Sequence, residues 1–459
     1  MSKRNIINGL YLVLGIGFWL SMKFCSYVSL VIISWVIMTI FMTINFNPIY
    51  AIYLLLLCLL NDISRDITGS FTVYTIEVIL LSVSLSWIFG MLLTKYNIYF
   101  YSSQKQNFIK EKYKFELPEY KILVISWIVF FGIILLSFIK SVNIPASIKQ
   151  TLRYLEIFLI YLIAFNFINK DNYSHVLKLF LCLSSIISII AIYQYFRFSN
   201  DYLAVKGTVF HHNTLASFLL YSIFITLSFL IITKHWRKII FVIVIILNLL
   251  ALKFSFSRGG WLSLILTGLI LILMYRKKFV LGLISVTILT IFFISFIPDN
   301  SRYKLAKSEI INNIRRDLAK VSLNIIKNEP LLGFGVGNYF YKYKNYIKNI
   351  SPSIDYIMEG GVINYYLHLT IETGVLGLIS FLSIIFFHLK YLIKGINKIT
   401  VYENKVILVG LTLSLISFLI HINFERILNI HFMGILFGLI LGMSIKVVNE
   451  FNEQQEKAK

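Results

Sequence analysis

Charged residues are scarce in this sequence. Only 14% of its 459 residues are Asp, Glu, Lys or Arg, whereas 58% are hydrophobic and the mean hydropathy is +0.80. In soluble globular domains about a quarter of the residues are charged and roughly half are apolar. The composition therefore excludes a soluble globular protein and indicates an integral membrane protein.

Cysteine is nearly absent. Cys25, Cys58 and Cys182 lie in or beside apolar runs at unrelated spacings. These spacings give neither a disulfide framework nor a metal-binding signature. We interpret the three cysteines as packing residues and expect no metal and no cofactor.

Acidic residues are also few. The chain has 21 Asp and Glu against 43 Lys and Arg, which gives a formal net charge of +22. In a soluble protein this balance would suggest a nucleic-acid partner. Here many of the cations lie in connectors between apolar runs and follow the positive-inside bias, so we expect no nucleic acid.

The apolar runs lack the alternation of apolar and polar residues that strands of a transmembrane barrel show over about ten positions. Runs such as 240–252 and 262–275 are apolar on every face, and a spanning helix needs about 20 such residues. We predict an all-α, polytopic integral membrane protein with about 12–14 transmembrane helices and one large extracytoplasmic loop late in the chain. The candidate runs are 8–22, 27–45, 48–60, 72–94, 121–140, 150–168, 177–195, 213–233, 239–255, 260–275, 279–297, 362–388, 405–423 and 427–447.

The chain divides into regions by these runs. No small-residue cleavage site follows the basic N-terminus, so we expect an uncleaved first helix. Placing the basic connectors in the cytoplasm puts both termini inside and the long loop outside. The predicted regions are N-terminal transmembrane helices (1–204), central transmembrane helices (205–297), the extracytoplasmic loop (298–361), C-terminal transmembrane helices (362–447) and a cytoplasmic tail (448–459).

The loop at 298–361 is the one long hydrophilic interval, and it is rich in Lys and Arg. Positive charge outside runs against the orientation bias, and an anionic ligand would account for it. The alternative is a long loop translocated regardless of its charge, with its lysines as ordinary solvated surface. We therefore look for ligand contacts among the arginines.

Arg258 directly follows an apolar run, in the motif Ser257–Trp261. An ionisable residue at or inside the membrane interface is costly unless it pairs or binds something, so it is a functional candidate. The alternative is an interface anchor beside Trp261. The serines and glycines around Arg258 would let another backbone or a ligand come close.

Arg316 lies in a segment with helical apolar periodicity that stops at Pro330. A guanidinium presents a planar fork that suits phosphate oxygens and stays charged at physiological pH. Arg315 beside it is a competing candidate. The apolar positions of the segment are Leu318, Val321, Leu323, Ile325 and Ile326.

The glycine-rich run Gly333–Asn338 has two interpretations. Its backbone amides could form an anion nest, or it could be a turn that returns the loop to the membrane. It lacks the Lys-Ser/Thr ending of a nucleotide P-loop and does not follow a strand of a βαβ unit. We therefore reject a nucleotide site and favour the turn.

Polar residues precede the run at 213–233. His211 and His212 are adjacent and no third ligand lies at metal-site spacing. Either one is a candidate general base or hydrogen-bond partner, with a purely structural role as the alternative. Lys206 and Asn213 belong to the same stretch.

Two carboxylates interrupt the C-terminal apolar runs. Glu372 within an apolar helix is expensive unless paired, so it is either a structural partner of nearby backbone or cations, or part of a substrate site. Glu425 and Arg426 lie at an outer junction. This places a carboxylate on the same side as Arg258 and Arg316.

The order of these motifs resembles the O-antigen ligase and O-antigen polymerase superfamily, which are bacterial inner-membrane glycosyltransferases with a large periplasmic loop late in the chain. The resemblance covers roughly residues 205–447. Its motifs are Ser257–Trp261, an Arg placed before Asn328–Asn338, Asn364 with Tyr366, and Glu372-x-Gly374-x-x-Gly377.

The resemblance implies that a glycan carried on undecaprenyl diphosphate is moved onto an acceptor hydroxyl outside the cytoplasmic membrane, without a metal. Arg258 and Arg316 match the arginines that would contact the diphosphate. Besides the donor and the lipid bilayer, a chain-length regulator and a flippase are expected partners. The candidate catalytic residues are Arg258, Arg316, Glu425 and His212, and the candidate substrate contacts are Lys206, His211, Asn213, Arg315, Asn364, Tyr366 and Glu372.

One position departs from the family pattern. Ligases of the family usually carry a His before the residue that matches Asn364, and it is their favoured base, but here that residue is Ile363. Either another group accepts the proton, with Glu425, His212 and His211 as ordered candidates, or transfer depends mainly on stabilising the leaving group. The difference favours a polymerase over a ligase that acts on lipid A core.

Two alternatives remain at this point. A ligase would transfer finished polymer to a lipid or protein acceptor. A transporter of lipid-linked sugars would bind with the same arginines and catalyse nothing. Against transport, the sequence shows no pair of Gly/Pro-broken spans in matching halves, and its cations concentrate in one loop.

Overall fold

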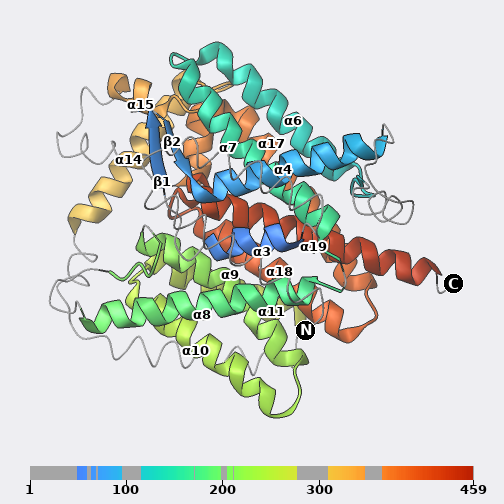
Figure 1. The fold of residues 1–459 in the computed structure, drawn as a ribbon. Helices are drawn as coiled ribbons and strands as arrows, with labels where there is room; N and C mark the ends of the chain where they lie inside the picture. Colours follow the sequence, from blue (N-terminus) through green and yellow to red (C-terminus); the bar gives the residue numbers. More distant parts are fainter. Residues whose placement is uncertain are drawn as a thin grey trace.

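The described part of the chain is helical apart from one hairpin (Figure 1). The structure is a computed structural model that describes residues 49–58, 64–68, 71–95, 115–169, 171–197, 204–209, 211–275, 309–346 and 364–457. The prediction of an all-α polytopic membrane protein is confirmed. The predicted runs 8–22, 27–45 and 279–297, and position Ile363, lie outside the described residues.

The described residues contain seven helices that are long and apolar enough to cross a membrane. Every predicted run from 72 onward in the described part coincides with a helix. The run at 48–60 gives only the ten-residue α3. The helices are α3 (Ile49–Cys58), α4 (Thr75–Lys95), α6 (Ile122–Ser137), α7 (Ile144–Phe167), α8 (Tyr173–Arg197), α9 (His212–Ile232), α10 (Lys238–Phe254), α11 (Arg258–Tyr275), α14 (Glu309–Asn328), α15 (Tyr339–Lys342), α17 (Tyr365–Lys398), α18 (Tyr402–His421) and α19 (His431–Lys457).

Short 3₁₀ segments connect several helices: η1 (Phe138–Lys140), η3 (His235–Arg237), η4 (Tyr343–Tyr346) and η5 (Ile427–Asn429). One hairpin was not expected from the sequence. Strand β1 (Ser64–Thr68) pairs antiparallel with β2 (Phe71–Tyr74), and Ser64 lies opposite Tyr74. The aromatic and β-branched sequence of β2 favours a strand, although the segment is too short to have stood out between two apolar runs.

Helix α19 is the centre of the bundle (Figure 1). Its apolar window is 89% buried, more than that of any other spanning candidate in the described residues. Gly434, Gly438 and Gly442 face α7, and a Cβ at Gly442 would lie 2.2 Å from the carbonyl oxygen of Tyr161. Small residues every fourth position let two membrane helices approach closely.

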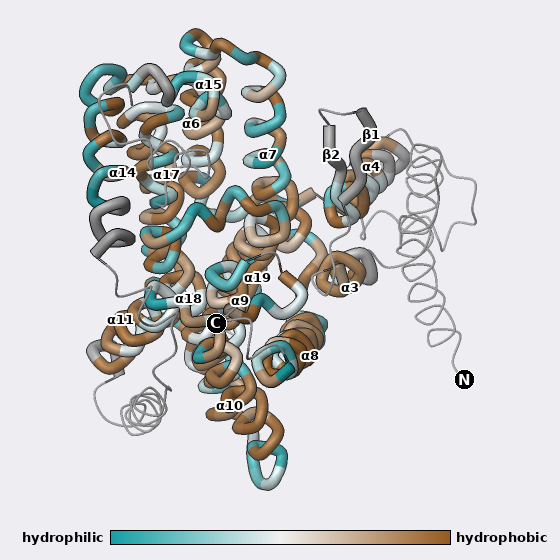
Figure 2. Tube along the Cα trace, turned by 90° about the vertical axis from the view of Figure 1, so that its left-hand side faces the viewer, coloured by the Kyte–Doolittle hydropathy of each residue, from teal (hydrophilic) through white to brown (hydrophobic). Residues whose placement is uncertain are grey.

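The predicted amphipathic segment forms helix α14. This helix lies alongside the first half of α17 (Figure 2). Leu318, Val321 and Ile325 are buried against Phe334 and other residues of the loop. Leu323 was expected on the apolar face, but its side chain is 52% exposed. It lies two residues after Val321, which is about 200° around the helix at 100° per residue, and so faces away from the bundle.

The glycine-rich run locks the loop onto the helices. Helix α17 is kinked at Gly374, whose φ of 71° favours glycine. In the kink, the N–H of Phe334 donates to the carbonyl of Ile371 (2.8 Å), and the N–H of Val375 donates to the carbonyl of Pro330 (2.8 Å). A Cβ at Gly374 would lie 1.9 Å from the carbonyl oxygen of Leu331.

The other side of the run contacts the junction of α6 and α7. The N–H of Val336 donates to Ser137 Oγ (3.2 Å). Asn338 Oδ1 accepts from the backbone N–H of Val142 (3.0 Å) and of Asn143 (2.7 Å). Because backbone amides of the run are bonded to protein acceptors, the structure favours the predicted turn over an anion nest.

Candidate functional site

Three segments that are far apart in the sequence meet at one place. They are the start of α9, the start of α11 and the connector between α18 and α19. Asn213 Nδ2 donates to Glu425 Oε2 at 2.8 Å, which joins the first to the third. The sequence-predicted residues His212, Asn213, Arg258 and Glu425 thus lie on the three segments that meet at this junction.

Arg258 is the first residue of α11, and its side chain is exposed. The residues on either side hold it against the end of α18. Ser257 Oγ lies 3.4 Å from His421 Nε2. A Cβ at Gly259 would lie 2.7 Å from Phe424 Cβ, so the close approach expected at this glycine is made by the chain itself. Arg258 therefore stands beside the segment that carries Glu425.

His421 is a site residue that sequence reasoning missed. Its ring is fully buried, and its Nδ1 lies 2.5 Å from Ser217 Oγ. Together with Ser257 this bond ties α9, α11 and α18 beneath Arg258. The only signal in the sequence was a histidine at the end of an apolar run, four residues before Glu425.

The two adjacent histidines have different positions. His211 is the N-cap of α9, and its Nδ1 accepts the N–H of Asn213 at 3.3 Å. Its ring packs on that of His212, with centroids 4.0 Å apart. His211 therefore stabilises the helix start, which leaves the half-buried His212 as the stronger candidate of the two. Lys206 is exposed nearby, and its N–H donates to Gln194 Oε1 (3.2 Å).

Arg316 lies elsewhere on the surface. Its side chain is exposed on α14. Among the residues that the structure describes, no contact joins Arg316 to Arg258, His212 or Glu425. The side chain of Arg315 lies outside the described set. The structure thus leaves Arg316 accessible to a ligand without placing it at the junction of α9 and α11.

Asn364 and Tyr366 support the site from the start of α17. Asn364 is the N-cap of the helix, and its Oδ1 accepts the N–H of Leu367 (3.1 Å). Tyr366 donates its hydroxyl to the carbonyl of Leu419 (3.0 Å), and the N–H of Tyr365 donates to the carbonyl of Ile422 (3.0 Å). These bonds hold the end of α18 just before Glu425.

Glu372 is enclosed, with only 2% of the residue exposed. Its Oε1 lies 3.5 Å from His368 Nε2 and accepts the N–H of Tyr339 at 3.4 Å. The carboxylate therefore joins α17 to the first residue of α15, directly after the glycine-rich run. This geometry favours the structural one of its two predicted roles.

Arg426 and Arg153 are cations that the candidate residues of the sequence analysis do not include. The Arg426 guanidinium lies over the Phe340 ring at 5.4 Å from its centroid. Burial lowers the pKa of Arg426, whereas nearby Glu372 acts in the opposite direction. Arg153 Nη1 donates to Gln150 Oε1 at 3.3 Å. Arg426 therefore anchors the connector between α18 and α19, next to Glu425, to Phe340 of the long loop.

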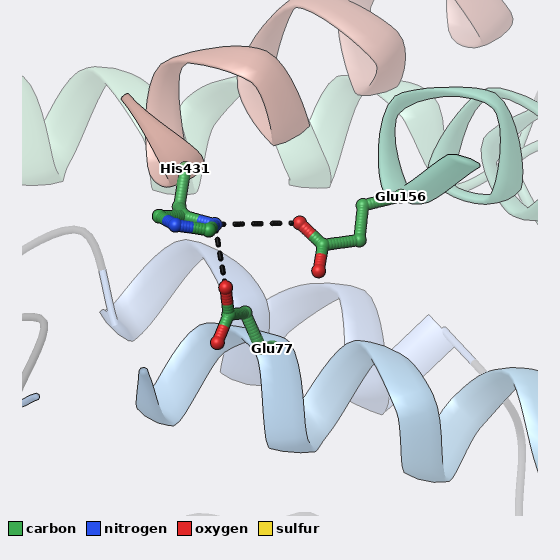
Figure 3. Close-up of side chains that lie close together, drawn as sticks. All are labelled: Glu77, Glu156 and His431. Atoms are coloured by element: carbon green, nitrogen blue, oxygen red, sulfur yellow. Dashed lines mark hydrogen bonds and ion pairs between the residues drawn. The ribbon is translucent and has the colours of Figure 1, made fainter. Parts of the chain in front are cut away.

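One other cluster combines carboxylates and histidine. Glu77, Glu156 and His431 come from α4, α7 and α19, and their ligand atoms lie within 4.8 Å of one another (Figure 3). His431 Nδ1 is 2.6 Å from Glu77 Oε1 and 3.4 Å from Glu156 Oε2. The shorter contact has the length of a charge-assisted hydrogen bond, so a proton on Nδ1 already fits the arrangement and we assign no cation.

We expect Gly259→Ala to lower both activity and thermal stability. The new methyl group would meet Phe424 at its Cβ, which cannot rotate away, and overpacking of this kind costs about 1–3 kcal/mol. Gly132→Ala is the matched control, because nothing lies within 4 Å of the new Cβ. Melting curves and turnover of the two variants in detergent measure the difference. Equal behaviour would show that the close approach of α11 to Phe424 is not needed.

Comparison with known proteins adds to this geometry. The family model described as "O-Antigen ligase" matches residues 243–382. Over these residues the match supports the resemblance to the O-antigen ligase and O-antigen polymerase superfamily. The chain is also 27% identical over 218 residues to an uncharacterized protein of Haemophilus influenzae, an alignment that covers 43% of this chain and 54% of that protein. The chain therefore matches about half the length of this relative.

The matched range lies within residues 205–447, over which the sequence motifs resemble the superfamily. The matched segment contains Arg258, Arg316, Asn364 and Glu372. Glu425 lies beyond it, and the start of α9 lies before it. The hydrogen bond of Asn213 to Glu425 therefore joins two residues that lie on opposite sides of the matched segment in the sequence. The chain is a multi-pass membrane protein, and its residues 243–382 are similar to an O-antigen ligase domain.

Proposed function

We propose that the protein is a membrane glycosyltransferase that polymerises oligosaccharide repeat units carried on undecaprenyl diphosphate. The observation that carries this proposal is the junction of α9, α11 and the α18–α19 connector. There the exposed Arg258 stands beside the segment that carries the half-buried Glu425, whose Oε2 accepts a hydrogen bond from Asn213. A leaving-group stabiliser and a proton acceptor are the two functions that glycosyl transfer to a hydroxyl requires.

In the proposed reaction the acceptor hydroxyl oxygen attacks the anomeric carbon of the donor glycan. The bond from that carbon to the diphosphate oxygen breaks, and undecaprenyl diphosphate leaves with the electron pair. Arg258 and Arg316 would stabilise the charge that develops on the diphosphate. The hydroxyl proton would pass to Glu425, for which His212 is the second candidate.

The proposed location is the bacterial cytoplasmic membrane, with the junction facing outward. The basic connectors support this orientation. In this orientation a lipid-linked donor can reach the junction from the outer leaflet after a flippase has delivered it. A chain-length regulator would act on the growing product.

We expect a chelator such as EDTA to leave the rate of glycosyl transfer unchanged, because arginines supply the positive charge that a metal otherwise gives. A rate restored only by Mg²⁺ or Mn²⁺ after chelation would contradict that role.

The decisive experiment is incubation of the purified protein with an undecaprenyl-diphosphate-linked repeat unit, with and without a candidate lipid acceptor. Product length and release of undecaprenyl diphosphate are followed. A ladder of longer lipid-linked glycans without added acceptor is the expected result. Glycan that appears only on the acceptor would make the protein a ligase, and binding without turnover of a matched substrate would favour a transporter.

The presence of Ile363 is the reason that we propose a polymerase and not a ligase. The family's usual base at this position is absent, so either another group accepts the proton or transfer depends mainly on stabilising the leaving group. Glu425 fills that need in this chain. The proposal accordingly gives Glu425 the role that the histidine has in the ligases.

A further inference from the structure

A cavity lies at the far end of the bundle from the candidate site. Helix α9 runs from His212 at the site to Ile232 at the cavity, 21 residues or about 30 Å. The cavity has a volume of about 960 Å³ and is bounded by the start of α8, the end of α9, η3, the start of α10 and the start of α18. The residues assigned to glycosyl transfer do not line it.

The lining has an apolar floor and a cationic rim. The floor is formed by Leu181, Ile232, Ile240, Phe241 and Val244. The rim carries Lys178, Lys234 and Arg237, and Glu403 is the one acid among the lining residues. The three cations are exposed, and among the described residues none of them forms an ion pair. The cavity therefore has an uncompensated positive charge above an apolar surface.

The connector that forms the rim has a defined shape. His235 has a φ of 56°, a left-handed conformation that non-glycine residues rarely adopt. Next to it, Trp236 is 69% exposed. Exposed tryptophan is typical of the membrane–water interface. The start of α10 at Lys238 adds the positive end of a helix dipole.

Next to the rim, the outer face of α10 carries exposed apolar side chains. Ile239 is 60% exposed, Ile243 51% and Ile246 47%. A ligand that fits both parts has an anionic head and an apolar tail. Basic pockets between transmembrane helices on the cytoplasmic side are suited to phosphate headgroups of lipids.

We propose that this cavity binds an anionic glycerophospholipid of the cytoplasmic leaflet, with its phosphate among Lys178, Lys234 and Arg237 and its acyl chains along α10. The inference goes beyond the proposed function, because it concerns the opposite end of the bundle and does not depend on the reaction. The cations of the cavity complement the charge of an anionic lipid, and this distinguishes such a lipid from the neutral lipids that cover any transmembrane surface.

The test uses the full-length protein in detergent and native mass spectrometry with added phosphatidylglycerol or phosphatidylcholine. Wild-type protein should retain phosphatidylglycerol in preference to phosphatidylcholine. The double variant Lys234→Gln/Arg237→Gln should weaken phosphatidylglycerol binding about 30-fold, since each cation near a lipid phosphate contributes roughly a fivefold factor. Lys390→Gln/Lys394→Gln is the matched control, because both lysines are exposed near the same end on α17 and do not line the cavity.

Four results would overturn the proposal. They are equal binding of the two lipids, unchanged phosphatidylglycerol binding in the cavity variant, an equal loss in the control variant, and full displacement of the lipid by inorganic phosphate. The first would indicate an apolar groove only, the third a general electrostatic surface, and the fourth a phosphate site. The single variant Arg237→Gln, with elution on a sizing column as the folding check, keeps the test valid if the double variant fails to fold.

Discussion

Replacing Arg258 with alanine is expected to reduce turnover by about 10²–10³-fold, the effect of removing one preorganised donor from a developing oxyanion. The protein should still insert and accumulate, because the side chain is exposed and a surface substitution usually changes stability by less than about 0.5 kcal/mol. Release of undecaprenyl diphosphate from a lipid-linked repeat unit measures the rate. A melting curve of the same sample checks the fold.

Arg258→Lys separates charge from geometry. Lysine keeps the charge but not the planar fork that binds two phosphate oxygens, so we expect partial recovery. Arg316→Ala should give a loss comparable to that of Arg258→Ala, whereas Lys327→Ala on the same exposed helix is the matched control and should be nearly silent. If Lys327→Ala, or Lys344→Ala in the same loop, proved as damaging as the arginine changes, a general electrostatic surface would replace the specific contacts with diphosphate.

The helical architecture was predictable because the membrane requires long apolar segments. Runs such as 213–233 and 405–423 correspond closely to α9 and α18. The pairing of these helices was not predictable, because an evenly apolar helix carries no stripe that identifies its neighbour. The glycines of α19 that face α7 became meaningful only with the structure.

The site was predictable in part, and the reason differs between residues. Arg258 and Glu425 are charges at the ends of apolar runs, so their cost in the membrane makes them visible in the sequence. Asn364, Tyr366 and Glu372 belong to the same family motifs, yet their side chains form hydrogen bonds with backbone groups of the protein. A motif does not distinguish a residue that contacts substrate from one that holds the chain. His421 was missed because a lone histidine in an apolar run has no spacing signal.

Replacing Glu425 with glutamine is expected to reduce turnover by about 10²–10⁴-fold, the usual contribution of a general acid or base. Glutamine has nearly the same size and can still accept the hydrogen bond from Asn213, but it cannot take the acceptor's proton. Donor binding should therefore remain while the chemical step fails. Retention of the lipid-linked repeat unit, measured together with product formation, separates these two steps.

Three further variants identify the base. Asn213→Ala should cost only about tenfold, because it removes one hydrogen bond that orients the carboxylate. His212→Gln should cost less than Glu425→Gln if the carboxylate is the base, and more if the imidazole is. His211→Gln should mainly lower stability, since His211 caps α9. Full activity of Glu425→Gln with loss in His212→Gln would transfer the role to the histidine, and activity in both would mean that transfer depends on leaving-group stabilisation by the arginines.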